Sequence, residues 1–166
     1  VGQIGLSQVW FRSFLEYGVK VAQLLLTHDD FADRARYLNA KSTLITLLDF
    51  PVIPIINEND TVATSELTLG DNDKLAALVC NLIEADLLVV LTDQDGLMTD
   101  DPKKTSKMRL VKESDVHSVQ LDTFAGGGGS WGRGGMVTKI EAARLASRSA
   151  TSTIIASGLK NNILLD

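Results

Sequence analysis

Four short apolar, β-rich runs alternate along the chain with segments of helical periodicity, and this alternation constrains the fold more than any other feature. The runs are residues 21–26, 52–56, 87–91 and 153–156. Continuous apolar runs of this length are typical of parallel strands buried on both faces. Strands that alternate with helices predict an α/β fold, in which right-handed crossovers place helices over a mostly parallel sheet.

Apolar residues at spacings of three and four predict the helices. One such face covers residues 6–17, a second covers 75–83, and a third helix is expected near 135–147. A long helix is also predicted over residues 29–48, ending before Pro51 because the residue that precedes a proline disfavours helical backbone. The polar stretch 101–119 fits neither pattern and is predicted to leave the α/β core as an excursion or flap.

Composition sets the class of protein. The chain has 166 residues, of which 45% are apolar and 22% charged, as in an ordinary globular domain. Its apolar runs are too short to cross a bilayer. Cys80, the single cysteine, cannot form an internal disulfide, and no targeting leader opens the sequence. We therefore expect one cytoplasmic domain, residues 1–166, with no membrane segment and no second domain.

The net charge of −5 is concentrated in one segment. Residues 56–73 contain five acidic side chains and no Lys or Arg, and the acidic residues elsewhere equal the 16 basic ones. A basic nucleic-acid-binding surface is therefore not expected. An acidic loop of this kind suits a metal ion, an ammonium group or a lysine from elsewhere in the chain, although a solvated surface loop has the same composition.

Ligands of open α/β sheets bind at the carboxyl ends of the strands, so the loops after residues 56 and 91 are the first places to search. The first loop carries Asn57, Glu58, Asn59 and Asp60, and a second acidic and amide cluster follows at residues 70–74. Gly70 permits a sharp turn there, and Asp71 or Asn72 can cap the next helix. These side chains either bind a ligand or only make turn and cap hydrogen bonds.

The loop after residue 91 ends a buried strand with a hydroxyl, two carboxylates and a turn glycine: Thr92, Asp93, Asp95 and Gly96. Such a loop could contact a ribose or a metal ion. It does not have the ligand pattern of an EF-hand. Taken alone, it is equally typical of a plain Asp-Gly turn.

The third loop, residues 126–135, contains seven of the thirteen glycines. It runs into the helix predicted near 135–147, whose N-terminal N–H groups could hold phosphate, with Lys139 one turn further on. Gly127, Gly129 and Gly132 match a G-x-G-x-x-G spacing, but no buried strand precedes them, so a dinucleotide site is disfavoured. A disordered loop followed by a surface lysine is the structural alternative.

Together the three loops offer an acidic and amide site, a hydroxyl and carboxylate turn, and a phosphate-binding helix start with a lysine. Phosphoryl transfer needs substrate positioning and neutralisation of the charge on the transferred group. Lysine, magnesium and helix N-termini supply that neutralisation without a covalent intermediate. The residues therefore favour a nucleotide-dependent phosphotransferase outside the P-loop class.

At these same loops the chain resembles the amino acid kinase family, in particular its members that phosphorylate glutamate. The resemblance covers about residues 2–158 and lies in four stretches: 52–61, 70–73, 91–97 and 134–139. It implies a three-layer αβα sandwich that binds Mg-ATP and phosphorylates the side-chain carboxylate of L-glutamate, as the first step of proline synthesis. The family further implies a cytosolic homo-oligomer inhibited by proline, with neither nucleic acid nor membrane as a partner.

The resemblance also implies the roles of individual residues. Asp60 and Asn72 would bind glutamate, with the Asp60 carboxylate facing the substrate ammonium, and Asp73 would orient the catalytic lysines. Lys139 would stabilise charge on the phosphoryl group. Magnesium would lie on the phosphates, with no protein ligand assigned. The implied nucleotide-binding residues are Thr92, Asp93, Arg133, Gly134, Gly135, Met136, Val137, Thr138 and Lys139.

The chain departs from the family pattern at both ends. The family's first strand carries a lysine, followed by a glycine-containing phosphate loop, and this sequence opens beyond both at Val1. The RNA-binding-like C-terminal domain of many members is also missing after Asp166. We therefore expect a partial kinase domain without the first strands. Two alternatives stay open: another amino acid kinase, such as an acetylglutamate type, or a non-catalytic remnant that binds nucleotide or amino acid.

Overall fold

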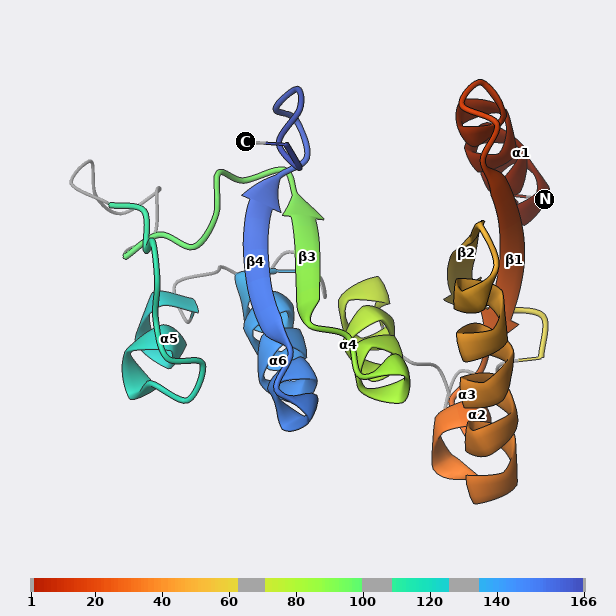
Figure 1. Cartoon of the computed structure of the whole chain (residues 1–166). Coiled ribbons are helices and arrows are strands. Elements are labelled where there is room, and N and C mark those ends of the chain that lie inside the picture. Colours follow the sequence, from red (N-terminus) through yellow and green to blue (C-terminus); the bar gives the residue numbers. More distant parts are fainter. Residues whose placement is uncertain (1, 63–70, 100–108, 126–134, 166) are drawn as a thin grey trace. The chain divides into compact units, whose positions relative to one another are not determined.

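The computed structural model describes residues 2–62, 71–99, 109–125 and 135–165. The chain divides into two compact units, Val1–Leu75 (unit 1) and Ala76–Asp166 (unit 2) (Figure 1). Within the described ranges, each unit holds one pair of parallel strands. The predicted α/β class with parallel strands is confirmed. In the part of the chain that the structure describes, no helix is long and apolar enough to span a membrane.

Among its described residues, unit 1 holds five complete regular elements. Their bounds are α1 (Gly2–Leu15), β1 (Lys20–Leu26), α2 (Asp29–Ala32), α3 (Arg34–Asp49) and β2 (Val52–Glu58). The two strands pair in parallel, with Lys20 opposite Val52 and Leu26 opposite Glu58. Both strands coincide with predicted runs. β2 continues for two residues beyond the apolar run, so Asn57 and Glu58 belong to the strand rather than to the loop.

The single helix predicted over residues 29–48 is wrong at one residue. Asp33 has extended backbone, with φ −87° and ψ 129°, and separates α2 from α3. Its Oδ1 accepts a hydrogen bond of 2.9 Å from the backbone N–H of Arg36. Asp33 is thus the N-cap of α3, and because an aspartate satisfies a free N–H group there, it starts a new helix instead of continuing the first.

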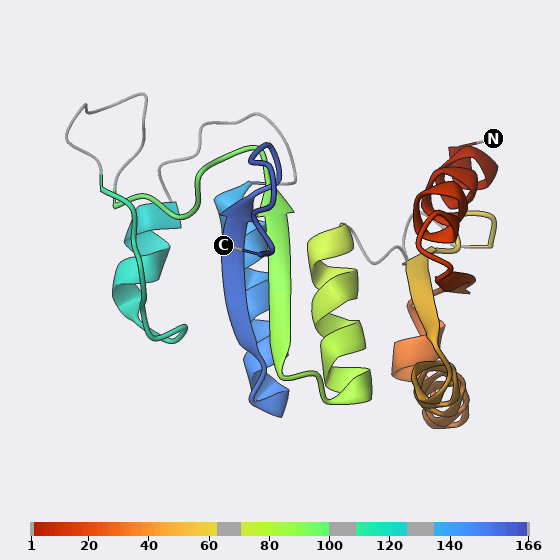
Figure 2. The same cartoon turned by 45° about the horizontal axis from the view of Figure 1, so that its top comes forward.

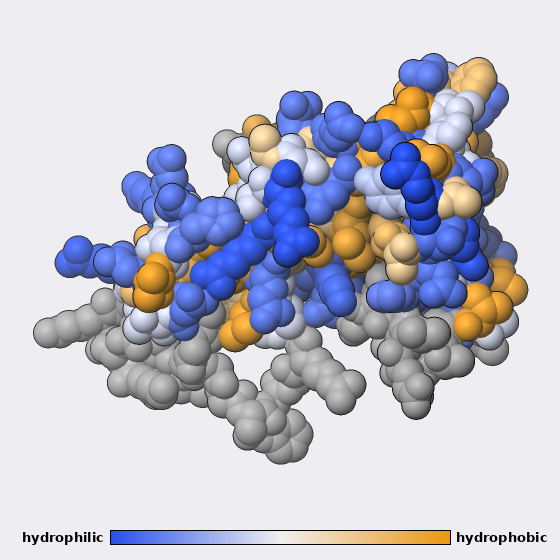
Figure 3. All heavy atoms as spheres, turned by 90° about the horizontal axis from the view of Figure 1, so that it is seen from below, coloured by the Kyte–Doolittle hydropathy of each residue, from blue (hydrophilic) through white to orange (hydrophobic). Residues whose placement is uncertain are grey.

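Helix α1 forms as its periodicity predicts, except that Tyr17 lies beyond its end. Its apolar face, however, does not form a core, since none of its described residues is buried. Trp10 and Phe14 stack on each other with ring centroids 5.9 Å apart. Apolar side chains reach the molecular surface among polar ones (Figure 3), and those of α1 include Ile4, Val9, Phe11 and Leu15.

Unit 2 is built around the second strand pair. Its elements are α4 (Asn72–Ile83), whose first turn precedes the division between the units, β3 (Leu87–Thr92), α5 (Val119–Ala125), α6 (Met136–Ala146), a 3-10 turn (Ser147–Ser149) and β4 (Ser152–Ser157). The strands are parallel, with Leu87 opposite Ser152 and Thr92 opposite Ser157. The predicted strands and the helices predicted over 75–83 and 135–147 are therefore confirmed.

Helices α4 and α6 cover one face of β3. Leu88 and Val90 alternate along the strand, so both point to that face and pack against small side chains of the two helices: Ala77, Cys80, Ala142 and Ala146. Leu87 and Leu91 point the other way and remain 49% exposed. The prediction that this strand is buried on both faces therefore holds for one face within unit 2.

Both helices begin at the edge of the sheet where β3 and β4 end (Figure 2). Hydrogen bonds fix the opposite edge. The Asn81 side-chain amide donates to the carbonyl of Leu145 at 2.9 Å, and the Thr151 hydroxyl donates to the carbonyl of Ala85 at 2.6 Å. The helix starts and the strand ends of unit 2 therefore face the same side, as a ligand site at the carboxyl edge requires.

Helix α5 and the segment before it are held to α6 by Arg144. Its Nη1 donates to Asp122 Oδ1 at 2.8 Å, and its Nε donates to the carbonyl of Val116 at 3.0 Å. The hydrogen bond from Arg144 lowers the pKa of the Asp122 carboxyl. Residues 109–118 are irregular apart from one antiparallel bridge between Met98 and Leu110, as expected of an excursion, but Val119 already begins a helix. The rest of the predicted excursion, residues 101–108, lies outside the described part.

Candidate active site

The loop after β3 presents the predicted hydroxyl and carboxylate at the carboxyl edge of unit 2. Thr92 is the last residue of the strand, and its Oγ1 donates to Asp93 Oδ1 at 3.2 Å. The Asp93 side chain is exposed. A hydroxyl and a carboxylate beside each other can bind hydrogen-bond donors of a ligand, such as the hydroxyls of a ribose.

The loop after β4 lies directly against this one. The N–H of Gly158 donates to the carbonyl of Thr92 at 2.8 Å. Further along the two loops, the Lys160 ammonium lies 2.8 Å from Asp95 Oδ1. Nothing local in the sequence marks Lys160 as a site residue. Its place depends on the pairing of β3 with β4.

Helix α6 begins where the sequence predicted a phosphate-binding helix start. Gly135 is its N-cap and makes no side-chain capping bond, because it has no side chain. The Thr138 hydroxyl donates to the carbonyl of Gly135 at 2.9 Å. The first N–H groups of a helix have no partner within the helix and attract anions. Met136 and Val137 lie in this first turn, whereas Arg133 and Gly134 fall outside the described residues.

Lys139 follows in the same helix and is only 9% exposed. Lysines are almost never buried to this degree unless their ammonium group has polar or charged partners. The burial of Lys139 therefore implies that the structure around it in unit 2 accommodates its ammonium group. The alternative of a surface lysine is excluded by its burial.

The residues expected to bind glutamate lie in the first unit and at the start of α4. Asp60 is exposed just after β2, next to a turn in which Asn59 Oδ1 accepts the N–H of Thr61 at 3.3 Å. Asn72 and Asp73 are the first two residues of α4, and Asp71 caps that helix by accepting the N–H of Lys74 at 2.8 Å. The cap expected of Asp71 is confirmed. The substrate roles of Asp60, Asn72 and Asp73 stay predictions.

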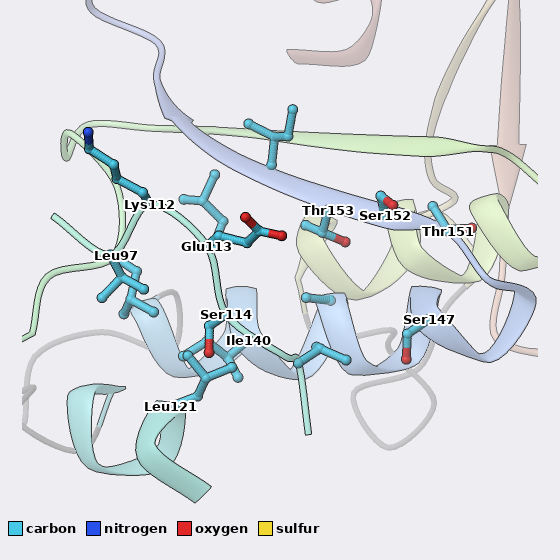
Figure 4. A pocket seen from close by; sticks show the side chains of 15 residues that line it. Leu97, Lys112, Glu113, Ser114, Leu121, Ile140, Ser147, Thr151, Ser152 and Thr153 are labelled. Atoms are coloured by element: carbon cyan, nitrogen blue, oxygen red, sulfur yellow. The ribbon is translucent and has the colours of Figure 1, made fainter. Parts of the chain in front are cut away.

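A cavity of about 470 Å³ lies elsewhere in unit 2, between β4, α5, α6 and the segment 109–118 (Figure 4). None of the predicted site residues that the structure describes lines it. Its walls are mixed, and they include Leu97, Glu113, Ser114, Leu121, Ile140 and Thr153. The Thr153 hydroxyl is buried without a hydrogen-bond partner in the described structure. The candidate site at the carboxyl edge, with Thr92, Asp93 and the start of α6, is therefore separate from the walls of this cavity.

Replacing Gly96 with alanine is expected to lower the free energy of unfolding by about 2–4 kcal/mol. Gly96 has φ +140°, which L side chains rarely adopt, and an added Cβ would lie 3.3 Å from the backbone carbonyl oxygen of Ile155. Its 2.9 Å approach to Leu110 Cδ1 costs little, because the end of that exposed side chain can move. Urea unfolding measures the change. Gly18→Ala is the matched control, since Gly18 has φ +69° and open space around it. An equal loss in both variants would show that positive φ alone, and not the nearby Ile155 carbonyl, sets the cost.

The chain matches the amino acid kinase family over residues 1–157. It therefore belongs to that family, which confirms the resemblance found in its sequence and the expected fold. Among its curated relatives are the glutamate 5-kinases of Burkholderia thailandensis, 57% identical over 166 residues, and of Pseudomonas savastanoi pv. phaseolicola, 56% identical over 165. Each match covers 99% of this chain and 45% of the relative. The chain thus spans about half the length of these relatives.

Among solved structures, a carbamate kinase from Giardia lamblia bound to AMP-PNP is similar, with a TM-score of 0.48 and 21% sequence identity. That likeness covers 73% of this chain and 38% of the carbamate kinase. The family assignment rests on the sequence match and not on this likeness.

Proposed function

We propose that the protein transfers the γ-phosphoryl group of ATP to the side-chain carboxylate of L-glutamate, the first step of proline synthesis. The observation that carries the proposal is the identity of 56–57%, over 99% of the chain, to proteins named glutamate 5-kinase. Neither an acetylglutamate-type kinase nor a non-catalytic remnant is favoured by these relatives.

The proposed reaction is a single displacement at phosphorus. A carboxylate oxygen of glutamate attacks the γ-phosphorus, the bond from that phosphorus to the bridging oxygen breaks, and ADP leaves with the electron pair. Because negative charge crowds around the phosphorus, the catalyst must mainly position the substrates and neutralise charge. Lys139 and the start of α6 would supply that positive potential.

The remaining roles are assigned by the family resemblance. Thr92 and Asp93 would bind the nucleotide together with residues 133–138, and Asp60 with Asn72 would bind glutamate. Asp73 would orient the catalytic lysines. Magnesium would be carried on the ATP phosphates, as is usual for this ion, and we assign it no protein ligand.

The resemblance also supports a cytoplasmic homo-oligomer whose inhibitor is proline. Its partners would then be ATP, glutamate and further copies of itself. Neither a nucleic acid nor a membrane belongs to this proposal.

Substrate selectivity tests the proposed function. The full-length protein, expressed from its own gene, is incubated with Mg-ATP and either L-glutamate, L-aspartate or N-acetyl-L-glutamate, and release of ADP is measured. In parallel, the thermal midpoint is recorded with Mg-ADP and each amino acid, because a ligand that binds only the folded protein must raise it. Of the three amino acids, we expect only glutamate to give ADP release. Only glutamate should raise the thermal midpoint above the value with Mg-ADP and no amino acid. ADP release with N-acetylglutamate in place of glutamate, or no response to any of the three, would refute the proposal.

A further inference from the structure

The turn after β4 places an ammonium group beside the proposed nucleotide-binding loop. Thr92 at the end of β3 pairs with Ser157 at the end of β4, and the N–H of Gly158 bonds to the Thr92 carbonyl. Lys160 lies two residues further on, in a turn in which its N–H donates to the carbonyl of Ser157 at 3.3 Å. Its side chain reaches across to the β3 loop, where the ammonium meets Asp95 at 2.8 Å.

The bond between Lys160 and Asp95 is of the kind that a ligand can replace. The two side chains are 56% and 57% exposed. Ion pairs at such exposure contribute little to stability, because water and salt screen them. A lysine side chain is also a flexible stem with three donors, so its ammonium can change partners without moving the backbone. A polyphosphate carries more negative charge than one carboxylate and would compete well for it.

We propose that Lys160 is a further nucleotide-binding residue, which leaves Asp95 and binds a phosphate oxygen of the nucleotide when the site is filled. The inference rests on the proposed function, which makes a nucleotide the ligand of this edge. It adds a second cation to the site, contributed by the turn after β4 and not by α6. ADP and ATP carry at least three negative charges on neighbouring phosphates, and one lysine at the start of α6 leaves most of that charge for other groups to balance.

The same geometry gives Asp95 an opposite effect. Its carboxylate holds Lys160 when no nucleotide is present, and it repels phosphate. Asp95→Asn keeps the size of the side chain, removes its charge and releases the ammonium. This variant is therefore expected to bind ADP as tightly as the unsubstituted protein or more tightly, although an ion pair of the edge has been lost.

Binding of Mg-ADP and of adenosine to the full-length protein, measured by calorimetry, tests the inference. For Lys160→Met we expect Kd for Mg-ADP to rise about tenfold, as for the loss of one charge-assisted hydrogen bond, while Kd for adenosine stays unchanged. Lys160→Arg keeps the charge and should retain most of the affinity. Arg148→Met is the matched control, since Arg148 is exposed in the turn that precedes β4, at the opposite edge.

Two outcomes would overturn the inference while leaving the proposed function standing. One is an unchanged Kd for Mg-ADP in Lys160→Met. The other is an equal loss of affinity for adenosine and Mg-ADP, which would mean a general disturbance of the edge and not a lost phosphate contact. If the unsubstituted protein bound adenosine and Mg-ADP equally weakly and released no ADP from ATP with glutamate, the proposed function and the inference would both fail.

Discussion

Replacing Lys139 with methionine is expected to lower kcat for glutamate phosphorylation by about a hundredfold to a thousandfold, as for the loss of one group that stabilises transition-state charge. Lys139 is 9% exposed in α6, and methionine is an unbranched side chain of similar length that suits a buried site. Methionine leaves the polar partners of the ammonium unpaired, so the thermal midpoint should fall by a few degrees and no more. Initial-rate kinetics and a thermal melt of the same preparations measure both quantities.

The controls for this variant separate charge from fold. Lys112→Met removes an exposed lysine of the segment 109–118 and should leave kcat unchanged. Lys139→Arg keeps the charge, but its planar guanidinium does not fit a site shaped for an ammonium, so we expect only partial activity. A Lys139→Met protein with normal kcat would remove Lys139 from the catalytic residues. A large fall of its midpoint would instead assign the lysine a structural role.

The strands could be predicted from sequence because their signal is local. Each predicted run has several consecutive apolar residues, and the structure places a strand at each of the four. The break at Asp33 could not be predicted from periodicity, since an aspartate within a helical pattern is compatible with a continuous helix. Its cap on the N–H of Arg36 decides the matter. Likewise, the apolar face of α1 indicated a helix correctly but not whether unit 1 buries it.

The residues of the candidate site also fall into two groups, those that local sequence predicts and those that only the tertiary structure places. Thr92, Asp93 and the start of α6 could be placed from sequence, because polar residues after a buried strand and a glycine before a helix are local patterns with a known position in parallel sheets. The ion pair of Lys160 with Asp95 could not, because the two residues are far apart in sequence and meet only through the register of β4 on β3. The burial of Lys139 also depends on packing. The local sequence pattern predicts where the helix starts, but it does not predict how buried the lysine is.

Replacing Leu82 with alanine is expected to lower the free energy of unfolding by about 2–5 kcal/mol, the usual cost of a cavity in a close-packed core. Leu82 has no exposed surface and is one of the two large side chains that the described structure buries completely. It lies in α4, next to Asn81, whose amide bonds to α6. Urea unfolding followed by circular dichroism measures the loss as a lower midpoint.

Two further variants show whether this loss comes from the cavity. Leu82→Met conserves most of the volume and should cost less than about 1.5 kcal/mol. Leu159→Ala removes the same atoms from a side chain that is 77% exposed, and its midpoint should hardly change. Equal losses in Leu82→Ala and Leu159→Ala would show that α4 does not pack as the structure describes.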